Sequence, residues 1–552
     1  MRSFCLLLPL TLLAGVELPL NAQQSSQAGH VWIPDNGDGT YKNPIIYADY
    51  SDPDVIRVGD DYYMTSSSFG HFPGLPILHS KDLINWKIVG HAALRYPYEE
   101  FNEPQHGMAI WAPSMRFHNG EFYIYFGDPD RGVFMTKAKN PVGPWEPLRL
   151  IRKATGWIDP CPLWDDDGKA YLVHAWSNSR SGIKSILAVN KMNTDGTQVL
   201  DDSTVVFVGH ASHPTIEGPK FYKRAGYYYI FAPAGGVKIG WQTVLRSKSV
   251  FGPYEDKKVL EQGTTNVNGP HQGAWVDTKS GQDWFLHFQD RYAYGRIIHL
   301  QPMRWENDWP VMGGDSDKNG IGEPVVSYKK PDVGKTYQIE VPQTTDEFNS
   351  PELGLQWQWE GNGQTSWISL DARKGWLRLF PQRPSTKYKN LWNVPSLLLQ
   401  KFPAPAFSAT AKLDCTSLSS AEQTGLLVFG LDYSYVGVRK AKGAYVVVQA
   451  ICGKADKGTA EEIIASADLE SPEIYLRVDV KQEDEAEIIP KVNCSFSYSV
   501  DGKSFRSLGK TFRAREGVWV GAKMGIFSMA TGVTAQLGFT DIDWFRVDPP
   551  KQ

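Results

Sequence analysis

A pattern of short apolar strands and aromatic-rich strands recurs along the first half of the chain. The stretch SDPDVIRVGDDYYM, at residues 51–64, sets the pattern with an acid and a proline, an apolar strand, a glycine turn and an aromatic strand. After the first copy at Asp52, related stretches begin at Ala112, Asp159, Glu217 and His271. A repeat of this length made of short strands is typical of a β-propeller blade. The pattern therefore predicts an all-β domain over residues 23–335, folded as a five-bladed propeller.

From about residue 345 the pattern changes to longer strands in which apolar and polar residues alternate. Segments such as WISLDARKGWLRLFP, TGLLVFGLDYSYVGVRK and EIYLRVDVK show this alternation, and turns such as Asp501-Gly502 separate them. A period of two residues indicates strands with one buried face. Many strands with almost no helical pattern predict a jelly-roll-like β-sandwich over residues 345–552. Residues 314–335 are rich in Gly, Asp, Lys and Pro and are expected to link the two domains.

The first residues carry the features of a secretory signal. Arg2 is followed by an apolar run at residues 4–16 and by small residues up to Ala22, where cleavage is expected. The run is too short to span a bilayer, and no later apolar run reaches that length. We therefore expect residues 1–22 to be removed and the protein to be exported, periplasmic or secreted, without a membrane span.

Composition narrows the range of functions. The net charge of -4 over 552 residues favours neither nucleic acid nor an anionic membrane as a partner. The 19 Trp, 25 Tyr and 25 Phe suit strands, and an aromatic ring also matches the apolar face of a sugar. After the signal, four cysteines without CxxC spacing remain, which argues against a zinc site. Pairing among the last three of them stays open; the four are Cys161, Cys415, Cys452 and Cys494.

Three acids stand at equivalent strand starts of the predicted blades. Asp52 and Asp159 directly precede prolines, and Glu217 precedes Gly-Pro. Because blades surround one axis, these carboxyl groups are expected to meet in a central pocket. Hydrolysis of a glycosidic bond needs an acid for the leaving oxygen and a second carboxylate, and a third carboxylate would raise the pKa of the acid. Asp54 lies two residues after Asp52 and is expected to point to the opposite face.

The motifs carry a resemblance to a known family. SDPDVIRVGDDYYM, WAPSM, GWIDPCPLWDDDGKAYLV, TIEGPKFYK and the GPHQG…FQD segment resemble glycoside hydrolase family 43. The second domain is similar to that of two-domain members, so the resemblance covers nearly the whole chain after the signal. It implies an inverting enzyme in which Asp52 is the general base and Glu217 the general acid. It further implies that Asp159 adjusts the pKa of that acid and orients it.

The resemblance also implies residues around the sugar. Phe69 and Trp111 are expected to shape the pocket, together with an arginine after the last blade, for which Arg291 and Arg296 both qualify. His271 of GPHQG is the expected ligand of a structural calcium ion, or of a water cluster, on the propeller axis. The chemistry itself is expected to need no cofactor, and the partner is an oligo- or polysaccharide.

We interpret the chain as an exo-acting inverting glycosidase that releases terminal α-L-arabinofuranose from plant hemicellulose, with β-D-xylose as the alternative sugar. The appended sandwich favours exo action because it would close one side of the groove. Two other classes stay open: a non-catalytic carbohydrate-binding propeller, and a retaining sucrose or fructan enzyme. The last would need Asn-Asp-Pro and Arg-Asp-Pro motifs, which are not evident.

Overall fold

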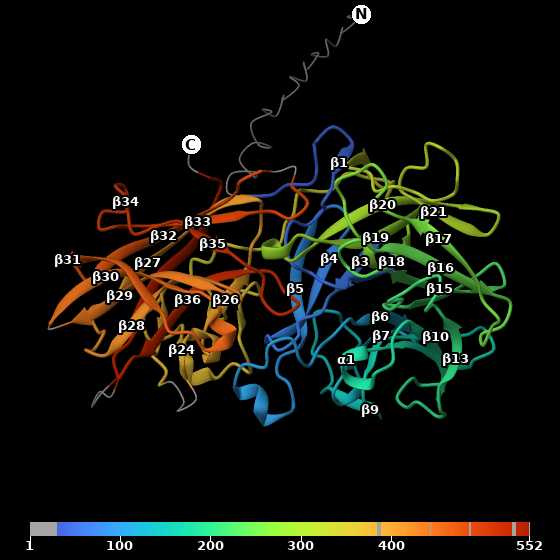
Figure 1. Ribbon diagram of the computed structural model, residues 1–552, viewed down its shortest axis with the longest axis horizontal. Helices are drawn as coiled ribbons and strands as arrows, with labels where there is room; N and C mark the ends of the chain where they lie inside the picture. Colours follow the sequence, from blue (N-terminus) through green and yellow to red (C-terminus); the bar gives the residue numbers. More distant parts are fainter. Residues whose placement is uncertain (1–29, 384–387, 442, 485–486, 533–536, 551–552) are drawn as a thin grey trace, which may run out of the picture.

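The computed structural model describes residues 30–550, apart from 384–387, 442, 485–486 and 533–536. Within these residues the chain forms two all-β bodies that lie side by side (Figure 1). The short helix α1 (Asn178–Ser181) is a single turn between two strands of the first body. The expected signal at residues 1–22 lies outside the described residues.

The first body is a five-bladed β-propeller, as the repeats predicted. Each blade is a four-stranded antiparallel sheet of consecutive strands, and each inner strand begins at one of the sequence repeats. The strands are β2 (Asp54–Val58), β3 (Asp61–Thr65), β4 (Gly74–Ser80) and β5 (Trp86–Ala93); β6 (Ser114–His118), β7 (Glu121–Asp128), β8 (Gly132–Ala138) and β9 (Arg149–Lys153); β10 (Trp157–Trp164), β11 (Ala170–Trp176), β12 (Ile186–Met192) and β13 (Thr204–Val208); β14 (Lys220–Arg224), β15 (Tyr227–Ala234), β16 (Trp241–Ser247) and β17 (Glu255–Leu260); β18 (His271–Asp277), β19 (Asp283–Asp290), β20 (Arg296–Glu306) and β21 (Trp309–Met312).

Blade five closes the ring against blade one without sharing a strand with it. Val55 and Met64 of blade one lie in one buried apolar cluster with Leu286 and Leu300 of blade five. The inner strands β18 and β2 are in contact. Full burial of side chains of this size contributes about 1.5–3 kcal/mol each, so apolar packing is sufficient to hold the two blades together. A separate two-stranded sheet pairs β1 (Thr40–Lys42) with β22 (Ser327–Lys329).

Asp54 joins three blades and faces away from the propeller mouth. Its side chain is fully buried, and its Oδ2 accepts hydrogen bonds from the Met115 backbone N at 2.7 Å and from Arg116 Nη1 at 2.8 Å. The Lys220 ammonium group lies 3.9 Å from the same oxygen. The carboxylate of Asp54 thus makes structural contacts, as expected, but alternation is not the reason, because residues two apart in a strand share a face. The two carboxyl groups diverge because Asp52 lies before β2 and has a left-handed φ of 56°.

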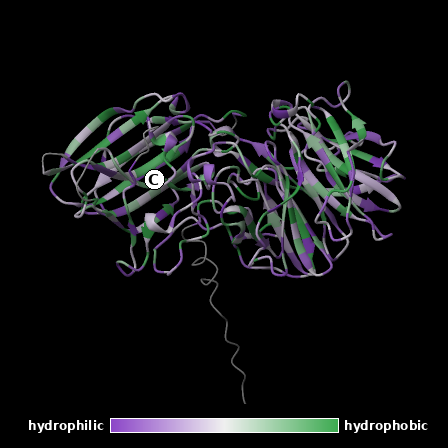
Figure 2. Ribbon diagram, turned by 90° about the horizontal axis from the view of Figure 1, so that it is seen from below, coloured by the Kyte–Doolittle hydropathy of each residue, from purple (hydrophilic) through white to green (hydrophobic). Residues whose placement is uncertain are grey.

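The second body is a β-sandwich, and the predicted sandwich fold is confirmed. Its core draws Leu426 from one sheet and Val478 and Phe545 from the other; Figure 2 shows apolar and polar residues mixed along its strands. In the order of their pairing, the seven-stranded sheet contains β23 (Gln358–Trp359), β26 (Leu398–Lys401), β36 (Lys523–Ala530), β28 (Glu422–Phe429), β29 (Tyr433–Ala441), β30 (Ala444–Cys452) and β31 (Glu462–Leu469). The eight-stranded sheet contains β24 (Ile368–Ser369), β25 (Leu377–Leu379), β37 (Thr540–Asp548), β27 (Ala406–Asp414), β32 (Glu473–Gln482), β33 (Val492–Ser499) and β34 (Arg506–Ser507), with β35 (Phe512–Ala514) beside β33.

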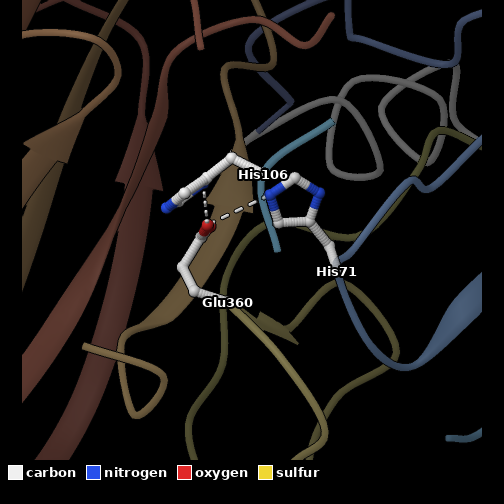
Figure 3. Close-up of side chains that lie close together, drawn as sticks. All are labelled: His71, His106 and Glu360. Carbon is white, nitrogen blue, oxygen red and sulfur yellow. Dashed lines mark hydrogen bonds and ion pairs between the residues drawn. The ribbon is translucent and has the colours of Figure 1, made fainter. Parts of the chain in front are cut away.

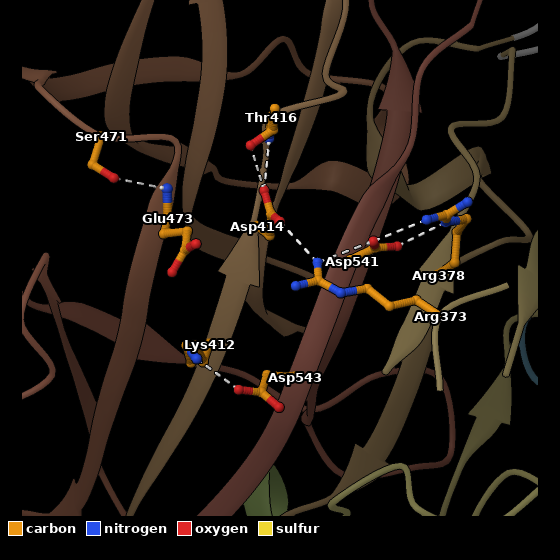
Figure 4. A network of polar contacts seen from close by, with 9 residues as sticks. All are labelled: Arg373, Arg378, Lys412, Asp414, Thr416, Ser471, Glu473, Asp541 and Asp543. Carbon is orange, nitrogen blue, oxygen red and sulfur yellow. Dashed lines mark hydrogen bonds and ion pairs between the residues drawn. The ribbon is translucent and has the colours of Figure 1, made fainter. Parts of the chain in front are cut away.

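Polar contacts hold the outermost strands of the eight-stranded sheet (Figure 4). Arg378 donates two hydrogen bonds to Asp541, at 2.8 and 3.0 Å, and Arg373 donates to Asp414 at 2.8 Å. A paired arginine fork of this kind fixes both partners in orientation as well as distance. These contacts keep the short strands β24 and β25 against β37.

Three tryptophans of the second body and the cysteines are packed in the interior. Trp357, Trp359 and Trp392 are buried, so none of them is an exposed sugar-binding platform. The cysteines among the described residues are buried and form no disulfide, which answers the question of pairing for the last three. In the part of the chain that the structure describes, no helix is long and apolar enough to cross a membrane.

Candidate active site

Three acidic side chains from three blades act on one another at the propeller mouth. Asp52 lies two residues before β2, Asp159 lies within β10, and Glu217 lies three residues before β14. The charge of Asp52 raises the pKa of Asp159, and the charges of Asp159 and Asp52 both raise the pKa of Glu217. Interactions of this kind weaken quickly with distance, so the structure brings the three predicted acids together.

The backbone turns two of these acids in the same unusual way. Asp52 and Asp159 both have φ of 56°, in the left-handed region, and each is followed by a proline. Such a conformation costs a residue with a side chain on the order of 1–3 kcal/mol and persists only where surrounding contacts impose it. The same turn occurs at equivalent points of two blades, and we infer that it orients the two carboxyl groups.

Asp52 is held by two donors. The Ser67 hydroxyl donates to Oδ2 at 2.6 Å, and Arg296 Nη1 donates to Oδ1 and Oδ2 at 3.2 and 3.4 Å. An ionised carboxylate only accepts hydrogen bonds, so a hydroxyl and a guanidinium are suitable partners for the anion. Asp52 is 4% exposed, and the contacts leave it as an oriented carboxylate at the edge of the pocket.

The pKa values of Glu217 and Asp159 are both raised, and Glu217 keeps its proton to the higher pH. Burial raises the pKa of Glu217 to about 8, and the charges of Asp159 and Asp52 add to the effect. Burial also raises the pKa of Asp159, with Asp52 as the second cause, although the Gly218 N–H that donates to its Oδ2 at 2.7 Å acts in the opposite direction. The Glu217 side chain keeps 31% of its exposure because it faces the open pocket. It is therefore a carboxyl group that carries a proton near neutral pH and has access to a ligand.

Aromatic rings from both bodies border the site. Phe69 and Trp111 lie edge to face with ring centroids 6.3 Å apart; Phe69 is buried, and its role in the pocket stays a prediction. Trp519, from the second body, lies 6.0 Å from Trp111, and the Arg296 guanidinium lies 6.0 Å from the Trp519 ring. Trp519 is 51% exposed, which is unusual for so large an apolar side chain and leaves a ring face free for a sugar.

Sequence reasoning missed Trp519 because its stretch, EGVWVG, shows neither the blade repeat nor strand alternation. The loop is placed instead by contacts between the two bodies. The Gly521 N–H donates to Asp49 Oδ2 at 2.8 Å, and the Ala522 N–H donates to the Ala293 carbonyl at 2.8 Å. In the sequence, the two flanking glycines indicate a loop, but no residue pattern indicates which part of the first body this loop contacts.

The structure separates the two arginines that the sequence left open. Arg296 pairs with Asp52, whereas Arg291 donates to the backbone carbonyls of Glu487 and Ile488, at 2.8 and 3.2 Å, in the second body. Arg291 therefore contributes to domain contact, and Arg296 is the arginine beside the carboxylates. A cavity of about 310 Å³ lies next to it, lined by residues that include Lys238, Asp290 and Trp519.

His271 lies beside the carboxyl groups. Its Nε2 is 3.7 Å from Glu217 Oε1, and neither of its buried ring nitrogens has a hydrogen-bond partner among the described residues. Burial lowers the pKa of His271 to about 3, and the nearby charge of Arg296 adds to this. Calcium takes six to eight oxygen ligands, and among the described residues no group of three metal-ligating side chains includes His271. A calcium ion here would therefore need water for most of its ligands, and the axial ion or water cluster stays a prediction.

A propeller whose mouth gathers three carboxyl groups, an arginine and aromatic rings defines a class of carbohydrate-hydrolysing enzymes. The family model for "Glycosyl hydrolases family 43" matches residues 41–310, and the model "Beta xylosidase C-terminal Concanavalin A-like domain" matches residues 345–548. The chain belongs to glycoside hydrolase family 43, and the protein is a glycosidase that acts on a carbohydrate substrate.

Individual relatives support the same assignment. A Xylanibacter ruminicola protein, whose name gives beta-xylosidase as its inferred activity, is 41% identical over 499 residues, 89% of this chain and 86% of its own. The non-reducing end alpha-L-arabinofuranosidase BoGH43B of Bacteroides ovatus is 30% identical, over 92% of this chain and 94% of its own. A solved bifunctional GH43-CE protein of Bacteroides eggerthii superposes with a TM-score of 0.80 at 26% identity, over 93% of this chain and 64% of that longer chain.

Proposed function

We propose that this enzyme is an exo-acting, inverting β-D-xylosidase. The catalytic assignment rests on one observation: three neighbouring carboxyl groups have different surroundings, which suit different protonation states. Asp52 is bound by Arg296 and Ser67, as suits an anion, while burial and two neighbouring charges favour the proton on Glu217. In a glycosidase this pair supplies a base and an acid.

In the proposed reaction a water oxygen attacks the anomeric carbon as the bond from that carbon to the leaving oxygen breaks. Asp52 accepts a proton from the attacking water, and Glu217 gives its proton to the leaving oxygen. Asp159 does not exchange a proton in this scheme. It is a positioning residue: its Oδ2 accepts the backbone N–H of Gly218, next to Glu217, and once Asp159 is ionised its charge adds to burial in raising the pKa of Glu217.

Exo action is supported by the wall that the second body builds. Trp519 stands beside Trp111 and Arg296, so one side of the mouth is covered by a loop from the sandwich. A pocket closed on one side accommodates the end of a sugar chain more readily than its interior. The exposed ring of Trp519 offers a stacking face to the terminal sugar or to its neighbour.

The names of the relatives support xylose over arabinose as the first candidate. The second-domain family is named for beta-xylosidases, and the relative with 41% identity carries that activity in its name, whereas the arabinofuranosidase relative is 30% identical. This reverses the order expected from the sequence. α-L-Arabinofuranosidase activity is the second candidate, favoured by that last relative.

The test compares 4-nitrophenyl β-D-xyloside with 4-nitrophenyl α-L-arabinofuranoside, using wild type, Asp52→Asn and Glu217→Gln. We expect the xyloside to have the higher kcat/KM. Asp52→Asn should lower it by about 10³-fold or more because the base is lost, and Glu217→Gln should lower kcat/KM on xylobiose to a similar extent because the acid is lost. Glu217→Gln should lose less activity on a substrate whose leaving group needs no proton. Preference for the arabinofuranoside would reverse the sugar assignment, and xylobiose activity near wild type in either folded variant would refute the catalytic pair.

Proton NMR of the first sugar released tests the stereochemistry. Inversion predicts that the β-xyloside releases α-xylose first, because water attacks the face opposite the leaving group. Initial appearance of β-xylose would instead indicate a covalent intermediate and a retaining mechanism.

A further inference from the structure

Two histidines and a glutamate meet at the junction between the two bodies. His71 comes from the loop between β3 and β4, His106 from the loop between β5 and β6, and Glu360 directly follows β23 of the sandwich (Figure 3). Their side chains are 5%, 13% and 2% exposed. One ligand-type atom from each lies within 4.8 Å of the others. None of the three belongs to the carboxylate site described above.

The hydrogen bonds of the two imidazoles decide which nitrogen each one presents to Glu360. His71 Nδ1 lies 2.9 Å from the Ser68 carbonyl oxygen, and His106 Nε2 lies 2.8 Å from the Trp392 carbonyl oxygen. A carbonyl oxygen only accepts, so both of these nitrogens carry hydrogens. In the neutral tautomers, His71 Nε2 and His106 Nδ1 then present lone pairs toward Glu360 Oε2. Two lone pairs facing an anionic oxygen repel it unless a cation lies between them.

A ring N–H held by a backbone carbonyl is also the usual support for a metal-binding histidine, because it fixes the tautomer and the direction of the opposite nitrogen. Here both histidines have that support, and the rings cannot turn freely. The His106 ring stacks on Trp392 with centroids 3.7 Å apart.

Two of the three separations between ligand atoms match a tetrahedral centre, and the third, between the two imidazole nitrogens, lies within 4.8 Å. His71 Nε2 lies 3.1 Å from Glu360 Oε2, and His106 Nδ1 lies 3.5 Å from the same oxygen. Ligands that stand about 2.0–2.1 Å from zinc at tetrahedral angles are roughly 3.3–3.4 Å apart. The observed separations bracket that value, so a zinc ion could bind with little movement of the side chains.

The surroundings provide space and a counter-charge. A small cavity of about 10 Å³ lies against the three side chains, close to the ~10–15 Å³ that one water molecule requires. Lys523 Nζ lies 3.4 Å from Glu360 Oε1, so the lysine occupies the other carboxylate oxygen and leaves Oε2 to the histidines.

We propose that His71, His106 and Glu360 bind a divalent transition-metal ion of the zinc type, with water from the cavity as the fourth ligand. Two histidines, one glutamate and a water form an established zinc ligand set. The sequence argument against zinc considered cysteines, and no cysteine takes part. The ion would join the loop of Phe69, two residues before His71, and the loop of Trp111, five residues after His106, to the second body.

The test uses the full-length protein without a polyhistidine tag, stripped with a chelator and titrated with Zn²⁺ by calorimetry and by elemental analysis. We expect one equivalent of zinc per chain and a rise in Tm that grows with zinc concentration, because the ion binds the folded state. Glu360→Gln and His106→Gln should each weaken binding by at least about 10-fold. His210→Gln, which changes an exposed histidine of the first body, should bind zinc as wild type does.

Co²⁺ provides a second readout that does not depend on the variants folding. Wild-type protein with one equivalent of Co²⁺ should show the strong visible absorption of a four-coordinate site, and excess Zn²⁺ should remove it. The proposal is overturned if the wild type binds less than a stoichiometric amount of either metal. It is equally overturned if folded Glu360→Gln retains wild-type affinity. In either case the cluster is an ion pair between a protonated His71 and Glu360, reinforced by Lys523.

Discussion

At the scale of single residues, position on the blade determines what a carboxyl group does. Asp52 and Asp54 are two residues apart, yet Asp52 faces the mouth and pairs with Arg296, while Asp54 is buried among other blades. Strand alternation does not give this difference, because residues two apart in a strand share a face; it arises because Asp52 lies before β2, in a left-handed conformation with φ of 56°. The convergence of Asp52, Asp159 and Glu217 was predictable, because the repeat places all three at equivalent strand starts.

Asp159 should control the alkaline limb of the pH profile. Asp159→Asn removes a negative charge beside Glu217 but keeps an oxygen for the Gly218 N–H. The pKa of Glu217 should fall, and activity is lost as pH rises through that pKa because the acid must be protonated. We expect the alkaline limb of kcat/KM to move to lower pH, with kcat about 10- to 10²-fold lower. The measurement is a pH series on xylobiose, whose leaving oxygen needs the proton of Glu217.

Asp277→Asn is the matched control for that series, since Asp277 pairs with Arg57 at the surface and should leave the profile unchanged. An alkaline limb that stays in place in Asp159→Asn would mean that burial alone determines the pKa of Glu217.

At the scale of elements, loops and inner strands matter most to the site. The choice between Arg291 and Arg296 was not predictable, because the short helical turn Tyr292–Tyr294 between them reverses the chain within five residues. The contribution of Trp519 was not predictable either, because it depends on backbone contacts to Asp49 and Ala293, which leave no pattern in side-chain type.

Trp519 should affect binding more than proton transfer. Trp519→Ala removes a stacking face at the pocket. Stacking of a nucleic-acid base on an aromatic side chain contributes about 1–3 kcal/mol, and we expect a sugar ring on Trp519 to lose binding energy of similar order. We expect KM to rise about 5- to 50-fold while kcat changes much less. Trp519→Phe keeps a ring and should stay near wild type. Equal kinetics for the alanine variant and wild type on xylo-oligosaccharides would show that the ring contacts no substrate.

Asp54 should be important for stability. Asp54→Ala leaves Arg116 buried without its carboxylate, and loss of one partner of a buried pair costs about 3–5 kcal/mol. Asp277→Ala breaks a partly exposed pair with Arg57 and should cost about 0–1 kcal/mol. Denaturation by urea, followed by tryptophan fluorescence, compares the two. A smaller loss for Asp54→Ala than for Asp277→Ala would contradict the structural role.

At the scale of the whole molecule, the repeat and the alternation predicted both folds but not their docking. Blade and sandwich patterns are local and are encoded in every strand. The docking depends on a few contacts between distant residues, such as Asp49 with Gly521, which are 472 positions apart. Sequence periodicity carries no information about such pairs. The position of Trp519 beside the pocket could therefore be seen only in the structure.

Asp49 should couple the two bodies. Its carboxylate accepts the backbone N–H of Arg296 at 3.0 Å and that of Gly521 at 2.8 Å. Asp49→Ala leaves both amides without an acceptor, at a cost of about 1–3 kcal/mol each. We expect a lower Tm and a higher KM, because the Trp519 loop loses its anchor. Asp60→Ala breaks an exposed pair with Lys279 and should change neither Tm nor KM. An unchanged KM in Asp49→Ala would show that substrate binding does not depend on this contact between the two bodies.

The exposed ring of Trp519 and the acids beneath it belong to different domains, and this has a consequence for how new specificities arise. Chain-end preference can be exchanged independently of bond cleavage, since residues 515–521 can vary while the blade residues stay constant. A chimera that carries this segment from a relative with another sugar preference should inherit part of that preference and keep the native hydrolytic machinery.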